Sequence, residues 1–134
     1  MAKEELTPSE SEWQIMEVFW SSETPLTSSE VISRLSEEKS KNPKMTRVLM
    51  NRLCQKGILA YTVDPEDARV YHYYPLKTRE ECSREKSRKF VESYFSGNHT
   101  NALAALLQSY TLTEEQIQEL EEILEKSRAK EDEA

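Results

Sequence analysis

The stretch that decides the fold runs from residue 42 to residue 74 and reads NPKMTRVLMNRLCQKG (42–57), ILAYTV (58–63), DPEDA (64–68) and RVYHYY (69–74). Asn42-Pro43 is a helix start, with an amide that can cap the first turn and a proline at the first helical position. Apolar residues then recur every three or four positions until Gly57, a typical helix stop. From residue 58 the apolar period changes to two, which predicts a β-hairpin with a loop of four or five residues.

Two helix starts precede this stretch. Thr7-Pro8-Ser9-Glu10 and Thr27-Ser28-Ser29-Glu30 both match the capping box, in which a hydroxyl and a carboxylate three residues later cap the first turn reciprocally. The first predicts a helix that ends near Ser21, and the second predicts a short helix. Three helices followed by a hairpin are typical of the winged helix-turn-helix, whose third helix enters the major groove of DNA.

The second half of the chain is predicted to be helical. Thr78 and Thr113 begin two more capping boxes, and Ser96-Gly97-Asn98 interrupts the helical pattern between them. A chain of 134 residues with 37% apolar residues can bury one modest core. We therefore predict a mainly α protein with a winged-helix DNA-binding domain at residues 1–76 and a helical dimerisation domain at residues 77–134.

Charge is distributed unevenly along this acidic chain. The net charge is −7, but residues 41–79 carry eight basic and three acidic side chains, a net charge of +5. The segments on either side, residues 1–40 and 80–134, carry −6 each. A local basic block is what contact with phosphates requires.

The helix after Asn42 is predicted to read DNA with its polar face. At 3.6 residues per turn, Leu49 and Leu53 share an apolar face, and Arg47 and Asn51 lie opposite. Arginine can pair with guanine, and asparagine or glutamine can pair with adenine, so this face could read bases. The alternative is that the face is simply in water, because any solvated helix has a polar outer face. Lys56 at the end of this helix is expected to contact a phosphate, and Arg69 lies near the tip of a basic wing. The predicted DNA-binding residues are Lys44, Arg47, Val48, Asn51, Arg52, Gln55, Lys56 and Arg69.

The C-terminal helices carry an apolar stripe with two interpretations. It could pack back on the winged helix, or it could pair with a second copy of the chain. Three short helices beside a small core leave much apolar area exposed in a monomer, which favours a two-fold dimer. The predicted dimerisation residues are Leu103, Leu106, Leu107, Ile117, Leu120, Ile123 and Leu124.

Taken in order, these segments resemble the BlaI/MecI/CopY family of penicillinase and methicillin-resistance repressors. The resemblance covers roughly residues 6–126. The motifs that carry it are Leu6-Thr7 with Glu12-Trp13-x-x-Met16-x-x-x-Trp20, Thr27 to Ile32, Pro43-Lys44 with Leu49-Met50-Asn51-Arg52-Leu53-x-x-Lys56-Gly57, Arg69 with Tyr71 and Tyr73, and Leu112-Thr113 with Leu120 and Leu124.

That resemblance implies a homodimeric repressor on a palindromic double-stranded DNA operator of antibiotic-resistance or metal-transport genes. It also implies release by a sensor protease or by another inducer such as a metal. The sequence departs from the family pattern at Lys41-Asn42, where Trp-Ser is usual, and at Met45 and Val48, where threonines are usual. The Cys-x-Cys motifs of the copper branch are missing near the C-terminus, so copper or zinc sensing by that route is not expected.

Other classes of protein are less consistent with the sequence. A winged helix that binds another protein instead of DNA is the alternative. Catalysis is not expected because the chain has no Ser/His/Asp or Cys/His constellation and no glycine-rich phosphate loop. Cys54 and Cys82 lack metal-ligand spacing, so we expect reduced thiols and neither a metal nor another cofactor. With no apolar stretch near the roughly 18 residues of a membrane span, we expect no membrane contact and a cytoplasmic location.

Overall fold

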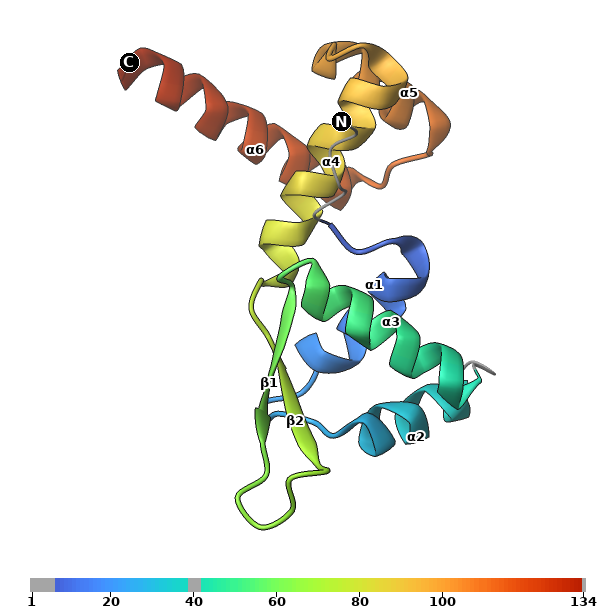
Figure 1. Ribbon diagram of the computed structural model, residues 1–134. Helices are drawn as coiled ribbons and strands as arrows, with labels where there is room; N and C mark the ends of the chain where they lie inside the picture. The colour runs from blue at the N-terminus through green and yellow to red at the C-terminus, as the bar shows by residue number, and fades with distance from the viewer. Residues whose placement is uncertain (1–6, 39–41, 134) are drawn as a thin grey trace. The chain divides into compact units, whose positions relative to one another are not determined.

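A computed structural model describes residues 7–38 and 42–133, so Leu6 and Lys41 of the family motifs lie outside the described residues. Figure 1 shows a mainly helical chain with one hairpin. Its elements are α1 (Glu10–Trp20), α2 (Ser28–Glu38), α3 (Pro43–Gln55), β1 (Leu59–Val63), β2 (Tyr71–Pro75), α4 (Arg79–Phe95), α5 (His99–Ser109) and α6 (Glu114–Glu133).

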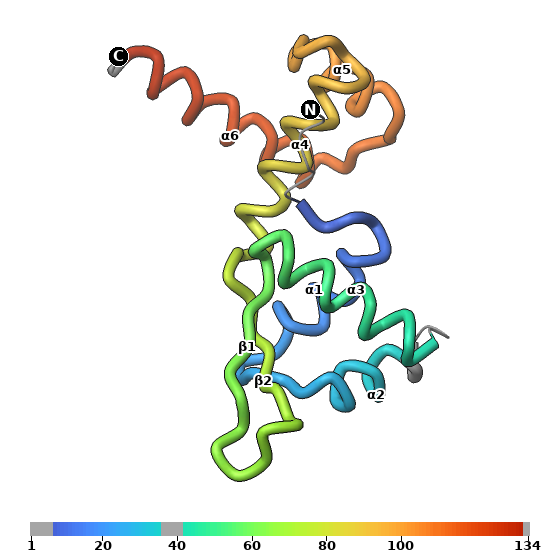
Figure 2. The backbone as a smooth tube through the Cα atoms, in the orientation of Figure 1, coloured from blue at the N-terminus to red at the C-terminus, as the bar shows by residue number. Residues whose placement is uncertain are grey.

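The chain divides into two compact units, residues 1–88 and residues 89–134. In the first unit α1, α2 and α3 pack against one another and against the hairpin, whose loop extends beyond the helices (Figure 2). This is the predicted winged helix-turn-helix, and the predicted fold class is confirmed. The boundary at residue 76 separates two predicted roles, DNA binding and dimerisation, and stays a prediction.

Capping residues fix the helix starts much as predicted. Asn42 accepts hydrogen bonds from the backbone N–H groups of Lys44 and Met45 at 2.8 and 3.3 Å, and Thr27 forms a reciprocal box with Glu30. The predicted cap of α1 was wrong by two residues. Ser9, not Thr7, is the N-cap, because its hydroxyl and backbone N–H pair with Glu12.

The hairpin is antiparallel, with Tyr61 opposite Tyr73 and Val63 opposite Tyr71. Residues 64–70 form the loop, which is longer than predicted because the Asp64 and Asp67 carboxylates accept backbone hydrogen bonds within it. Leu26 pairs with Tyr73 through two backbone hydrogen bonds of 2.8 and 2.9 Å and so connects the hairpin to the entrance of α2. Gly57 has a φ of +76°, which favours glycine at the turn from α3 into β1.

Each element of the first unit contributes to one core. Helices α1, α2 and α3 supply most of it, the hairpin closes one side, and α4 adds a thiol. The buried side chains are Ile15, Met16, Phe19, Leu26, Val31, Leu35, Leu49, Met50, Leu53, Ile58, Leu59, Tyr73 and Cys82.

The second unit contains the end of α4 together with α5 and α6. Asn98 caps α5 through a hydrogen bond from the Asn101 backbone, and Thr113 forms the predicted box with Gln116 at the start of α6. Most large apolar side chains of α5 and α6 remain exposed in the single chain, among them Leu103, Leu106, Leu107, Ile123 and Leu124.

We predict that two leucines of the N-terminal unit contribute very different amounts to its stability. Leu53 is fully buried and Leu76 is about half exposed. We expect Leu53→Ala to lower the free energy of unfolding by about 2–5 kcal/mol, because it removes buried methyl groups and leaves a cavity. Leu76→Ala, the matched control, should cost about 1 kcal/mol or less, since half of that side chain is already in water. Urea denaturation checks this, and equal losses for the two variants would contradict the assigned core.

Candidate nucleic-acid interface

Helix α3 presents two chemically different faces. Thr46, Leu49, Met50 and Leu53 are buried on the side that faces the core. The opposite side is made of exposed polar and basic residues, with Val48 half-buried at its margin. The exposed set is Lys44, Arg47, Asn51, Arg52 and Gln55. The structure thus brings five of the eight predicted DNA-binding residues together on one accessible surface.

This surface is held rigidly because α3 is fixed along its length. Its N-terminus is capped by Asn42, and the buried Thr46 hydroxyl donates to the Asn42 backbone carbonyl at 3.3 Å. Its buried face packs against α1, α2 and β1. A rigid helix with exposed Arg, Asn and Gln side chains has the groups that recognise base edges in the major groove.

Lys56, at the C-cap of α3, is placed differently from the other predicted contacts. Its ammonium donates to Glu12 Oε1 at 2.6 Å and to the Thr7 backbone carbonyl at 3.2 Å. The Lys56 side chain is 21% exposed, and that of Glu12 is 2% exposed. Its charge is therefore occupied inside the N-terminal unit.

Sequence reasoning missed Glu12 as a functional partner. A signal for it was present, because Glu12 shares a helical face with Ile15, Met16 and Phe19, and a carboxylate on a buried face needs a cation. Pulling Lys56 away toward a phosphate would leave this carboxylate buried and unpaired. Breaking a buried pair costs about 3–5 kcal/mol, against about 0–1 kcal/mol for an exposed ion pair. Energetically, the pair with Glu12 prevails.

The environment of Glu12 lowers its pKa. Burial alone raises the pKa of this carboxyl, but the hydrogen bonds from the Lys56 ammonium and the Ser9 backbone, with the charge of Lys56, outweigh it. Glu12 is therefore ionised at neutral pH, and one of its oxygens serves both the capping box of α1 and the end of α3.

The wing carries the eighth predicted contact. The Arg69 side chain is 91% exposed, and its guanidinium pairs with both oxygens of Asp67 at 3.1 and 3.2 Å. These hydrogen bonds lower the pKa of Asp67. An ion pair this exposed contributes little stability, so Arg69 can exchange Asp67 for a phosphate at low cost.

Aromatic rings stiffen the same hairpin. Tyr61 and Tyr71 stack with ring centroids 4.5 Å apart, and Tyr73 is the buried ring beside them. His72 lies on the other face of β2, and its Nε2 atom is 2.9 Å from Asp64 Oδ2. This hydrogen bond lowers the pKa of Asp64. The tyrosines thus act in cross-strand packing, and His72 is a hydrogen-bonded histidine.

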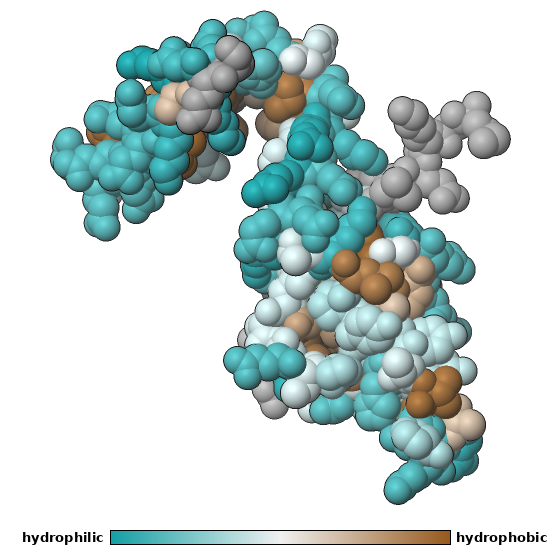
Figure 3. Space-filling view, turned by 90° about the vertical axis from the view of Figure 1, so that its left-hand side faces the viewer, coloured by the Kyte–Doolittle hydropathy of each residue, from teal (hydrophilic) through white to brown (hydrophobic). Residues whose placement is uncertain are grey.

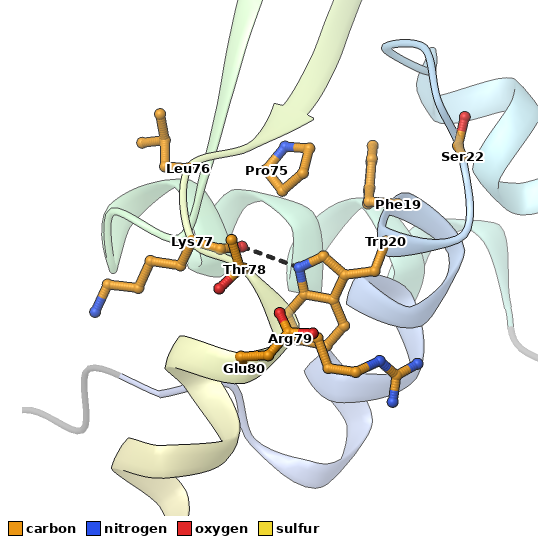
Figure 4. Close-up of a pocket in the computed structure, with 9 residues that line it drawn as sticks. All are labelled: Phe19, Trp20, Ser22, Pro75, Leu76, Lys77, Thr78, Arg79 and Glu80. Atoms are coloured by element: carbon orange, nitrogen blue, oxygen red, sulfur yellow. Dashed lines mark hydrogen bonds between the residues drawn. The ribbon is translucent and has the colours of Figure 1, made fainter.

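A pocket of about 350 Å³ lies between the end of α1 and the start of α4 (Figure 4). Trp20 Nε1 donates to the Lys77 carbonyl at 2.9 Å, and the Arg79 guanidinium lies over the Trp20 ring. Both basic side chains that line the pocket already have carboxylate partners, Glu85 for Lys77 and Glu17 for Arg79. The pocket therefore offers no free cation to an anionic ligand.

The surroundings of the two cysteines affect their thiols in the same way. Burial raises the pKa of both Cys54 and Cys82, which keeps each thiol protonated at neutral pH. Within residues 7–38 and 42–133, no group of three or more His, Cys, Asp or Glu side chains is arranged to hold a metal ion. In the same described residues, none of the helices is both long enough and apolar enough to span a bilayer.

Comparison with known proteins assigns this chain to a family. Residues 8–126 match the family described as "Penicillinase repressor". The chain belongs to the penicillinase repressor family. It is 30% identical over 125 residues to the penicillinase repressor of Bacillus licheniformis, which covers 92% of this chain and 94% of the relative. It is also 25% identical over 118 residues to the methicillin resistance regulatory protein MecI of Staphylococcus aureus strain N315, with 88% and 93% covered.

Solved structures agree with this membership. The solution structure of the DNA binding domain of the repressor BlaI is 28% identical, with a TM-score of 0.50, and the match covers 60% of this chain and 93% of that one. A mutant of S. aureus MepR bound to an oligodeoxyribonucleotide has a TM-score of 0.50 at 15% identity, over 91% of this chain and 78% of that one, which shows a shared fold alone. The resemblance to BlaI/MecI/CopY repressors is confirmed, and members of the penicillinase repressor family are transcriptional repressors.

The buried pair predicts a pH-dependent contribution to stability. Because the pKa of folded Glu12 lies below its usual value of 4.5, the ionised carboxylate stabilises the fold above that pH. This stability is lost as the pH falls through the folded pKa. We expect Glu12→Gln to lower the free energy of unfolding by about 1–3 kcal/mol at pH 7 and by progressively less below pH 4.5.

Denaturant unfolding across this pH range measures the difference. Glu10→Gln, which removes an exposed carboxylate from the same turn, is the matched control and should change little. A loss for Glu12→Gln that is the same at pH 7 and well below pH 4 would contradict the assigned ion pair.

Proposed function

We propose that this protein is a homodimeric transcriptional repressor that binds a palindromic DNA operator through α3 and the hairpin wing. The observation that carries the proposal is the exposed face of α3, where Arg47, Asn51 and Gln55 lie on a helix anchored by its opposite side. Membership of the penicillinase repressor family supports DNA-binding repression as the function.

The contacts divide by chemistry into base readers and phosphate contacts. Arg47, Asn51 and Gln55 have the donors and acceptors to read base edges, with Val48 beside them for apolar contact. Lys44 and Arg52 are proposed to neutralise phosphates, and Arg69 of the wing is proposed to add a further phosphate contact. Met45 and Val48 replace the usual threonines of the family, so the hydroxyl contacts of those threonines are not carried over to this protein.

Dimerisation supplies the second half of a two-fold recognition surface. Leu103, Leu106, Leu107, Ile123 and Leu124 are exposed on α5 and α6, and Leu124 is 64% exposed. Figure 3 shows hydrophobic side chains among hydrophilic ones on this unit. With the half-buried Ile117 and Leu120 they form the proposed dimer surface, because a second copy removes this apolar area from water.

The relatives indicate which genes this repressor controls. Their names point to penicillinase and methicillin resistance, so we infer that the target genes serve β-lactam resistance. We further propose that a sensor protease or another inducer releases the repressor from its operator. We also propose that the protein acts in the cytoplasm and has no catalytic activity of its own.

Base readout is tested on α3 itself. We expect Arg47→Ala and Asn51→Ala to change the preferred base at one position of each half-site and to cost about 1–3 kcal/mol on the selected operator, because each side chain supplies specific base contacts. Arg84→Ala, an equal loss of charge on α4, is the control and should keep the same preference.

Selection of bound sequences from a random DNA pool, followed by titration at fixed salt, measures both effects. If the wild-type protein selects no sequence even at low salt, DNA recognition is excluded. A protein-binding role for the winged helix then takes its place.

Charge placed on the proposed dimer surface tests assembly. We expect Leu124→Glu to shift the protein from dimer to monomer at micromolar concentration and to weaken operator binding, because a carboxylate would be buried opposite apolar side chains. Gln118→Glu adds the same charge to the opposite side of α6 and should leave the dimer intact. Sedimentation equilibrium distinguishes them, and a Leu124→Glu protein that remains dimeric would place the interface elsewhere.

A further inference from the structure

The ion pair between α1 and the end of α3 has no role in the contacts assigned so far. We propose that Glu12 and Lys56 are positioning residues for DNA recognition, and that Lys56 holds the C-terminal end of α3 in place instead of contacting a phosphate. The inference rests on the proposed function, because it concerns how α3 is held while it reads the operator.

The geometry connects two segments that are distant in sequence. Lys56 lies 44 positions after Glu12 and 49 after Thr7, and its ammonium hydrogen-bonds to the carboxylate of one and the carbonyl of the other. The same Glu12 oxygen accepts the Ser9 backbone N–H at 2.9 Å. The end of α3 is therefore tied to the first turn of α1 through one buried oxygen.

This connection fixes the end of α3 that the cap at Asn42 does not reach. Asn42 restrains the first turn, and the buried stripe ending at Leu53 restrains the middle. Lys56 follows directly after Gln55, which belongs to the proposed reading face. Bidentate contact with a base needs the right distance and angle, so a small change in the direction of the last turn affects base selectivity more than phosphate contact.

The competing role for Lys56 is a phosphate contact, which was our sequence-based prediction. It requires the ammonium to leave a carboxylate that is 2% exposed. The two roles make different predictions for Glu12. If Lys56 contacts phosphate, removing the Glu12 charge frees the lysine and strengthens binding to all DNA. If the pair positions α3, the same change weakens binding to the operator in particular.

The experiment compares Glu12→Gln, Lys56→Met, their double variant and Lys56→Arg in the full chain. Glu12→Gln keeps the size and the hydrogen bond to Ser9 but removes the charge, and Lys56→Met keeps most of the stem. Glu10→Gln is the matched control on α1, and Arg52→Met is the matched control for a lost cation on α3. Affinity is measured for the selected operator and for a scrambled duplex over a range of salt, at a temperature where thermal unfolding shows each variant to be folded.

We expect both single variants to lower the ratio of operator affinity to scrambled affinity about fivefold or more, the low end of what one base contact discriminates. The salt dependence of binding should stay that of the wild type, since no phosphate contact is lost. The double variant should be no worse than the poorer single variant, because both remove one interaction. Lys56→Arg, which can still pair with Glu12, should restore most of the ratio.

Three results would overturn the inference. A phosphate contact is shown if Lys56→Met weakens operator and scrambled DNA alike, reduces the salt slope by about 0.9, and Glu12→Gln does not weaken binding. A purely structural role is shown if the variants unfold at lower temperature but bind both DNAs as the wild type does. Should Lys56→Met fail to fold, Glu12→Gln decides alone. If the wild-type protein selects no operator, the proposed function is overturned as well. If the wild type binds selectively and the variants keep its ratio of operator affinity to scrambled affinity, only the positioning role is overturned.

Discussion

Helix α3 must bury Leu49, Met50 and Leu53 while leaving Arg47 and Asn51 in water, and the rest of the N-terminal unit satisfies this constraint. Three short helices and a two-stranded hairpin provide a small core, so the buried side of α3 is in contact with α1, α2 and β1 at once. A change in the tilt of α3 would expose part of this core. The surface proposed to read DNA is held in place because its opposite side is the core of the domain.

An ion pair is buried beside this small core. Glu12 lies in line with Ile15, Met16 and Phe19, at a buried position that an apolar residue would usually occupy. A buried pair adds little net stability over such a residue, but it is demanding in geometry, because one ammonium must satisfy a carboxylate and a carbonyl together. This demand makes the pair more useful for fixing the direction of a helix than for holding the fold together.

Local chemistry in the sequence was sufficient for most of the fold. The caps at Asn42, Thr27, Thr78 and Thr113, the stop at Gly57 and the two faces of α3 depend on residues within a few positions of one another. What the sequence could not reveal depends on distant residues. Lys56 leaves the exposed set because it pairs with Glu12, which lies 44 positions earlier, whereas the cap of α1 at Ser9 is a local box with Glu12.

The structure also changes how the net charge of the basic block, residues 41–79, is interpreted. Of its eight basic residues, Lys56, Lys77 and Arg79 lie in ion pairs with carboxylates outside residues 41–79, so a net charge of +5 overstates the charge available to DNA. The basic side chains exposed on α3 are Lys44, Arg47 and Arg52. A protein that makes about 6–10 phosphate contacts needs more cations than the three that one copy is proposed to offer, Lys44, Arg52 and Arg69. Two copies offer six and reach the lower end of this range, and for that reason we infer that operator binding and dimerisation are coupled in this protein.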